Sequence, residues 1–131
     1  NPEFPIFFLE MAISDFRQTI RLGLKHYGAY YGRGRAYVLL GFLKKTKNLD
    51  KGIADLSQCI KLQPDHANAY GTRGMAYHEK LEHDKAIDDL TQAIRLQPND
   101  KMFYTNRSKV YEAIGNRAKA EADYRKAAEL G

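Results

Sequence analysis

A segment of about 34 residues recurs along this chain, and this internal repeat restricts the fold more than any other feature of the sequence. The run GIADLSQCIKLQPD, which starts at Gly52, aligns with AIDDLTQAIRLQPN, which starts at Ala86. Pro98 follows Pro64 by 34 residues in the same register. A period of this length predicts an array of stacked units, because one such unit is too short to bury an apolar core by itself.

The segments that precede these two runs also align with each other. HYGAYYGRGRAY, which starts at His26, matches HANAYGTRGMAY, which starts at His66. A third copy follows at the same step, so that Tyr70, Tyr77, Ala86 and Ala93 recur as Tyr104, Tyr111, Ala120 and Ala127. The chain therefore contains three registered copies.

Each copy has the pattern of two helices. Ile53, Leu56 and Ile60 follow a helical spacing, which the next copy repeats. Pro64 ends the second helix, and Asp65 predicts the start of the following one. Small residues occupy the places where the two helices of a copy must cross closely, namely Gly34, Gly74, Ser108, Gly52, Ala86 and Ala120.

These residues resemble the tetratricopeptide repeat. Its pattern is a large aromatic residue, Leu-Gly, a tyrosine, an alanine with a large residue four positions later, and a closing proline. In this sequence the pattern reads Tyr70, Arg73-Gly74, Tyr77, Ala86, Leu90 and Pro98. The resemblance implies an all-α fold, an α-solenoid of antiparallel helix pairs with about seven helices.

The repeats divide the chain into five parts. Residues 1–5 are interpreted as a remnant of a cloning site or as disordered, and residues 6–25 as a half repeat with only its second helix. Three repeats then follow at residues 26–65, with a six-residue insertion, 66–99, and 100–131, which ends without a capping helix. The array is therefore expected to be a piece of a longer one, or to have its ends covered.

A charged residue stands in each copy where the family usually has leucine, namely Arg33, Arg73 and Arg107. One helix later each copy has an aspartate, namely Asp55, Asp89 and Asp123, with Asp15 in the half repeat. A buried charge needs a partner, so we predict a structural series of Arg–Asp pairs. Four aspartates and three arginines favour pairing across repeats, as Asp15–Arg33, Asp55–Arg73 and Asp89–Arg107. Pairing within each repeat is the competing geometry, and binding of acidic ligands by the arginines is the functional alternative.

The insertion follows Tyr37 and begins with the apolar run VLLGFL. It predicts a helix that continues to about Lys44. The preceding helix also starts early, because Ile6 to Leu9 are apolar. We expect these overhangs to pack on each other, either as a local core or as an exposed self-association patch that includes Phe7, Phe8, Leu39 and Phe42.

The resemblance also implies a concave groove, lined by the first helix of each repeat, that receives a peptide or a helix of a partner protein. Carried onto this chain, the groove residues are Tyr31, Arg35, Asn68, Thr72, Met75, His78, Met102, Asn106 and Lys109. This mixture suits an extended peptide, and the alternative is a face that is merely solvated. Some members hold chaperone C-termini with a set of Lys, Asn and Arg residues, of which Asn106 resembles one. The complete set is absent, because Asn68 and Thr72, or Gly28 and Gly32 in the first full repeat, stand where it needs other residues.

The sequence has no features that indicate nucleic-acid binding, membrane insertion or a reactive thiol. The net charge of +5 is spread along the chain, and the cluster at Lys44, Lys45 and Lys47 is typical of a solvated loop, so nucleic acid is not an expected partner. No apolar run approaches the roughly 20 residues that cross a bilayer. Cys59 occupies an alanine slot of the repeat, which predicts a buried thiol.

No phosphate-binding loop or catalytic constellation is found, so we expect no enzyme and no cofactor. His78 and His83 stand five residues apart, and no cysteine or carboxylate pattern completes a metal site around them, so no metal is expected. The sequence thus predicts a protein–protein interaction scaffold, with a cytoplasmic location. The alternative is an assembly module that forms homo-oligomers through the ends of the array and the apolar overhang.

Overall fold

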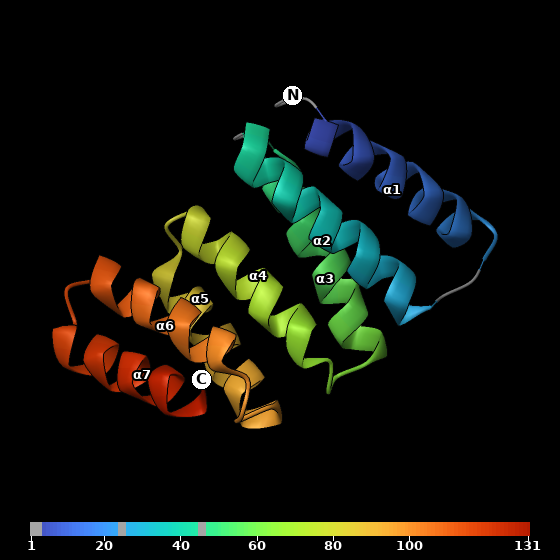
Figure 1. Ribbon diagram of the computed structural model, residues 1–131. Helices are drawn as coiled ribbons and strands as arrows, with labels where there is room; N and C mark the ends of the chain where they lie inside the picture. The colour runs from blue at the N-terminus through green and yellow to red at the C-terminus, as the bar shows by residue number, and fades with distance from the viewer. Residues whose placement is uncertain (1–3, 24–25, 45–46) are drawn as a thin grey trace. The chain divides into compact units, whose positions relative to one another are not determined.

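The computed structural model describes residues 4–23, 26–44 and 47–131. These residues form helices and no strand (Figure 1), in agreement with the predicted all-α class. The helices are α1 (Phe4–Arg21), α2 (Tyr27–Lys44), α3 (Asn48–Leu62), α4 (Ala67–Glu79), α5 (His83–Leu96), α6 (Lys101–Ala113) and α7 (Arg117–Leu130). They divide into two compact units, Asn1–Asp65 with α1 to α3 and His66–Gly131 with α4 to α7.

In the first unit α2 packs against both α1 and α3. The beginning of α1 lies beside the end of α2 (Figure 1), where Lys44 and Glu10 form an ion pair of 2.9 Å. Ile13 and Leu40 belong to the buried cluster between the two helices, and Ile6 and Leu9 pack against it.

The insertion lengthens α2, as predicted. This helix has 18 residues and ends at Lys44, whereas α4 of the next repeat has 13. The start of α1 differs from the expectation, because Phe4 and Pro5 are helical. The interpretation of residues 4 and 5 as disordered is therefore wrong, and proline is compatible with the first turn of a helix, where its missing N–H would have no partner anyway. Residues 1–3 lie outside the described residues.

In the second unit each helix packs against the next one in the chain, and α4 also touches α6. Ala86, Leu90 and Val110 form one buried cluster at the centre. A second cluster, which contains Ala93 and Phe103, lies at the other end of α5 and α6. The small residues of the repeat pattern thus allow a close-packed core at each crossing.

Side-chain hydrogen bonds cap the starts of four helices in the described ranges, and at α2 the His26 ring accepts one from the backbone N–H of Gly28. The His66 ring accepts a hydrogen bond from the backbone N–H of Ala69, and the Asp100 carboxylate accepts one from Met102. Asn116 caps α7 in the same way. The predicted cap at Asp65 is therefore one residue too early, because the histidine after it accepts from one of the free N–H groups of the first turn.

Candidate partner-binding surface

One face of the second unit is built by α4 and α6. Gly71 of α4 lies directly against the Phe103 ring of α6, since a Cβ added to this glycine would be 2.5 Å from a ring carbon. Asn68, Lys109 and Met102, which is 51% exposed, are accessible on this face, and Thr72 and Asn106 are half-buried.

Two residues predicted for the groove have contacts inside the repeat. Met75 packs against the cluster of Ala86, Leu90 and Val110, so part of its side chain belongs to the core. The Nδ1 atom of His78 lies 3.4 Å from that of His83 at the start of α5. Burial lowers the pKa of His78, His83 and Lys109 lower it further, and Glu79 opposes the shift.

In the first unit the predicted groove residues lie on α2. Tyr31 is half-buried and Arg35 is exposed. Because they are four residues apart in a helix, they lie on the same face, one turn from each other.

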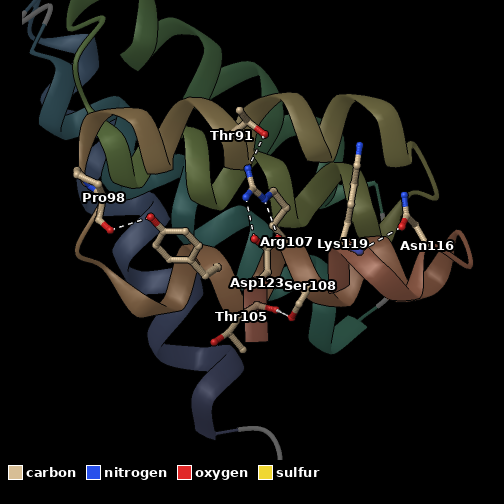
Figure 2. A network of polar contacts seen from close by, with 9 residues as sticks. Thr91, Pro98, Thr105, Arg107, Ser108, Asn116, Lys119 and Asp123 are labelled. Atoms are coloured by element: carbon tan, nitrogen blue, oxygen red, sulfur yellow. Dashed lines mark hydrogen bonds and ion pairs between the residues drawn. The ribbon is translucent and has the colours of Figure 1, made fainter. Parts of the chain in front are cut away.

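The arginines pair with aspartates of their own repeat. Nε and Nη2 of Arg33 donate to the Asp55 carboxylate, each at 2.8 Å. Arg73 binds Asp89 at 2.7 and 2.8 Å. Figure 2 shows the third pair, in which Arg107 donates to Asp123 at 2.8 and 2.7 Å.

The predicted pairing across repeats, as Asp15–Arg33, Asp55–Arg73 and Asp89–Arg107, is therefore wrong, and the competing geometry within each repeat is correct. The reason lies in the small residue after each arginine. A Cβ on Gly74 would lie 3.3 Å from the Asp89 Cβ, so the crossing of α4 and α5 brings this aspartate beside Arg73. Asp15 is exposed and needs no buried partner.

Each of the three guanidinium groups lies over at least one tyrosine ring. The Arg73 guanidinium carbon lies 5.7 Å from the centre of the Tyr70 ring and 5.8 Å from that of Tyr77, while Lys85 approaches the Tyr77 ring. The hydrogen bonds to Asp55 and Asp123 raise the pKa of Arg33 and Arg107. These arginines are therefore charged, and the aspartate of the same repeat engages two of the five N–H donors of each guanidinium.

In the overhang of α1 and α2, some of the predicted apolar residues pack in a local core and others are exposed at the surface. Leu9 packs against the Leu40 cluster, and Phe42 and Leu39 are half-buried. Phe7 and Phe8 are 57% and 53% exposed, and their rings meet edge to face. Phe7 and Phe8 are thus not part of the buried cluster between the two helices, and Phe7 lines a hollow with Ile6, Glu10 and Lys44.

Several contacts escaped sequence reasoning. Arg107 also donates to the Thr91 hydroxyl of α5 at 3.1 Å, which joins two consecutive repeats (Figure 2). The Tyr104 hydroxyl donates to the backbone oxygen of Pro98 at 2.9 Å.

A lysine in each repeat lies over a tyrosine ring, and this contact was not foreseen either. The lysines are Lys51, Lys85 and Lys119. Each one stands immediately before the small residue at which the two helices cross, so its recurrence at a step of 34 residues was a signal that could have revealed the contact.

The described ranges of the chain lack the features of a metal centre with three or more protein ligands and of a bilayer span. No group of three or more His, Cys, Asp or Glu side chains converges there as a metal-ligand set. None of the helices in those ranges combines the length and the apolar character that a bilayer span needs. Cys59 is buried, and its burial raises the pKa of the thiol to about 11.

Comparison with known proteins places the repeat pattern in a family. Two family models, both described as tetratricopeptide repeat, match residues 67–100 and residues 27–66 and 103–130. No curated protein matches the chain.

Solved structures share the fold. The crystal structure of MamA is 28% identical over 98% of this chain and 71% of its own, with a TM-score of 0.83. TTC0263, a thermophilic TPR protein of Thermus thermophilus, is 22% identical over 98% and 69% of the two chains, with a TM-score of 0.84. MamA from Desulfovibrio magneticus RS-1 is 22% identical over 95% and 67%, with a TM-score of 0.82.

Proposed function

Because this chain belongs to the tetratricopeptide-repeat family, we propose that it is an interaction scaffold that holds an extended segment of a partner protein on the face of α4 and α6. Tyr31 and Arg35 lie on α2 of the first unit and form a separate candidate contact surface there. The proposal assigns no catalytic step to the chain.

The observation that carries this proposal is the chemistry of the exposed side chains on that face. Met102 offers apolar surface, Asn68 offers an amide that can both donate and accept, and Lys109 offers a cation. An extended peptide presents the complementary groups, since its backbone has unpaired N–H and C=O groups and its side chains alternate in direction. The half-buried Asn106 would fix the register of such a backbone.

A displayed library of random peptides tests the proposal without knowledge of the natural partner. Peptides are selected on the wild-type chain, and their affinity is then measured for the double variant Asn106→Ala/Lys109→Glu. We expect a loss of at least about tenfold, because two polar contacts of about 1 kcal/mol each are removed. The matched control is Lys126→Glu, which reverses an exposed charge on α7 and should leave the affinity unchanged.

Selected peptides that bind both variants equally well would contradict the proposal. Circular dichroism of each variant separates this outcome from unfolding. A failure to select any peptide at all would also count against peptide binding on this face.

A second candidate function is self-association through α1 and α2. The observation in its favour is a patch of large apolar side chains, Phe7, Phe8, Met11 and Leu43, each about half exposed. Isolated apolar residues are normal on a protein surface, but Phe7 and Phe8 touch edge to face, and exposed apolar residues that gather in this way favour an interaction site. Glu10 and Lys44 lie beside it and form an ion pair.

Sedimentation equilibrium tests this candidate. The wild-type chain should gain mass as its concentration rises, and Phe7→Ser/Phe8→Ser should remain a monomer. Leu22→Ser is the control, because Leu22 is exposed but follows the other end of α1. A monomeric wild-type chain, or an oligomer that survives the double substitution, would exclude the patch.

A further inference from the structure

Two histidines face each other across the turn between α4 and α5. His78 lies in the last turn of α4, and His83 is the first residue of α5. Their Nδ1 atoms are 3.4 Å apart, and their ring centres are 5.4 Å apart with the planes inclined by 52°. Both side chains are half-buried, so their orientation is set by packing on either side of the turn.

We propose that His78 and His83 bind one divalent transition-metal ion, such as zinc, through their Nδ1 atoms, with water in the remaining coordination positions. The site uses other side chains than the proposed peptide contacts, although Lys109 of that face acts electrostatically on His78. The apolar patch on α1 and α2 belongs to the other compact unit. It differs from the expectation drawn from the sequence, where the five-residue separation and the lack of further ligands argued against a metal.

The distance between the two nitrogens fits this chemistry. Zinc binds imidazole nitrogen at about 2.0–2.1 Å, and two nitrogens 3.4 Å apart then subtend an angle of about 110° at the metal, close to tetrahedral. Imidazole is also a good ligand for copper and nickel, whereas magnesium prefers oxygen ligands. A soft or borderline metal is therefore favoured over a hard one.

The surrounding charges moderate the affinity. Glu79 favours a cation at His78, and Lys109 opposes it. With only two protein ligands, the open positions are filled by water, as in sites where a metal keeps exchangeable ligands. The site is therefore weaker than a structural zinc site with four protein ligands.

A metal at this position would join the two helices of one repeat. The turn between these helices contains Leu81 with a φ of 64°, a backbone conformation that is costly for any residue other than glycine. A metal that links the two helices would hold this turn in its folded conformation. Because the unfolded chain does not hold the two rings together, binding favours the folded state and raises the melting temperature.

Isothermal titration calorimetry of the chain without a polyhistidine tag tests the proposal. We expect one zinc ion per chain and no heat with magnesium chloride. His78→Ala and His83→Ala should each weaken zinc binding at least about tenfold, because one imidazole alone loses the advantage of a linked second ligand. His26→Ala is the control, since it removes a histidine from another part of the chain and should leave the affinity unchanged.

The melting temperature provides a second readout. Zinc should raise it in the wild-type chain and in His26→Ala, and it should not do so in His83→Ala. His83→Gln keeps a polar side chain at the turn, so its failure to bind zinc would show that the loss is due to the ligand and not to misfolding. Zinc binding that is unchanged in both single variants, or lost equally in His26→Ala, would overturn the site.

Discussion

The Arg73 guanidinium donates two hydrogen bonds to the Asp89 carboxylate, at 2.7 and 2.8 Å, across the crossing of α4 and α5. Only 8% of the Asp89 side chain is exposed, so the charge has little access to water. Removing one partner of such a pair leaves the other charge buried without compensation.

The substitution Arg73→Ala should therefore lower the free energy of unfolding by about 3–5 kcal/mol. In the double variant Arg73→Ala/Asp89→Ala the loss should be at least about 1 kcal/mol smaller than the sum of the two single losses. Urea denaturation of all four chains measures this coupling. The same cycle for Arg107 and Asp89, the pair expected from the sequence, should show a coupling below about 1 kcal/mol. A larger coupling for that pair would contradict pairing within the repeat.

The turn at Leu81 should be improved by glycine. Leu81 has a φ of 64° and is 76% exposed, while the equivalent position in the next repeat is Gly115 with a φ of 80°. Leu81→Gly should raise the free energy of unfolding by about 0.5–1 kcal/mol, because glycine adopts this conformation without steric cost. The reciprocal change Gly115→Leu should destabilise by about 1–2 kcal/mol, although a Cβ there has open space around it. Chemical denaturation measures both changes, and equal stability of all three chains would show that the backbone conformation carries no strain.

Close packing at Gly71 gives a third prediction. Alanine is the better helix former by about 1 kcal/mol, yet its Cβ would lie 2.5 Å from a ring carbon of Phe103. Gly71→Ala should therefore destabilise the chain by about 1–2 kcal/mol, because overpacking exceeds the gain in helix propensity. In a Phe103→Leu background the same substitution should cost less. Thermal unfolding of the four chains checks this, and a stabilising Gly71→Ala would be inconsistent with the observed approach of α4 and α6.

The buried thiol predicts a dependence on pH. Burial raises the pKa of Cys59 to about 11 from an ordinary value of 9.0, so the folded chain keeps the proton at a pH where the unfolded chain has lost it. The unfolded state then binds fewer protons, and stability falls as the pH rises from about 9 towards 11. In Cys59→Ala this part of the pH dependence should disappear, with little loss of stability at pH 7, because Ala93 occupies the equivalent buried position.

Reactivity of the thiol provides an independent measurement. Iodoacetamide should modify the folded chain at pH 8 far more slowly than the chain in urea, since the thiolate is the reactive form. Equal rates in the two conditions would show that Cys59 is accessible in the folded protein.

Much of the fold could be predicted because the repeat supplies its own internal comparison. The apolar spacing of Ile53, Leu56 and Ile60 indicated a helix, and the aligned copies fixed where each helix recurs. The insertion after Tyr37 predicted the longer α2. These features depend on the spacing of residues along the chain, which can be read from the sequence without knowledge of how the helices pack.

Contacts that depend on how helices cross were harder to predict. The sequence showed that Arg33 needs an acidic partner, but both the preceding and the following helix offered one at Asp15 and Asp55. The choice depended on the crossing at Gly34, where a Cβ would be 3.0 Å from the Asp55 Cβ. For the candidate surface, the pattern identified Met75 as accessible, although part of this long flexible side chain fills the core.

Pairing within the repeat also affects what can happen to a chain of this kind when repeats are gained or lost. Arg73 and Asp89 are 16 residues apart and Arg107 and Asp123 are equally spaced, so both members of each pair belong to one duplicated stretch of sequence. Deleting or copying a whole repeat removes or adds a neutral pair. Had the pairs joined different repeats, the first arginine and the last aspartate of every array would have been buried without a partner. With pairing inside the repeat, the terminal copies keep their charges paired however many copies the array contains.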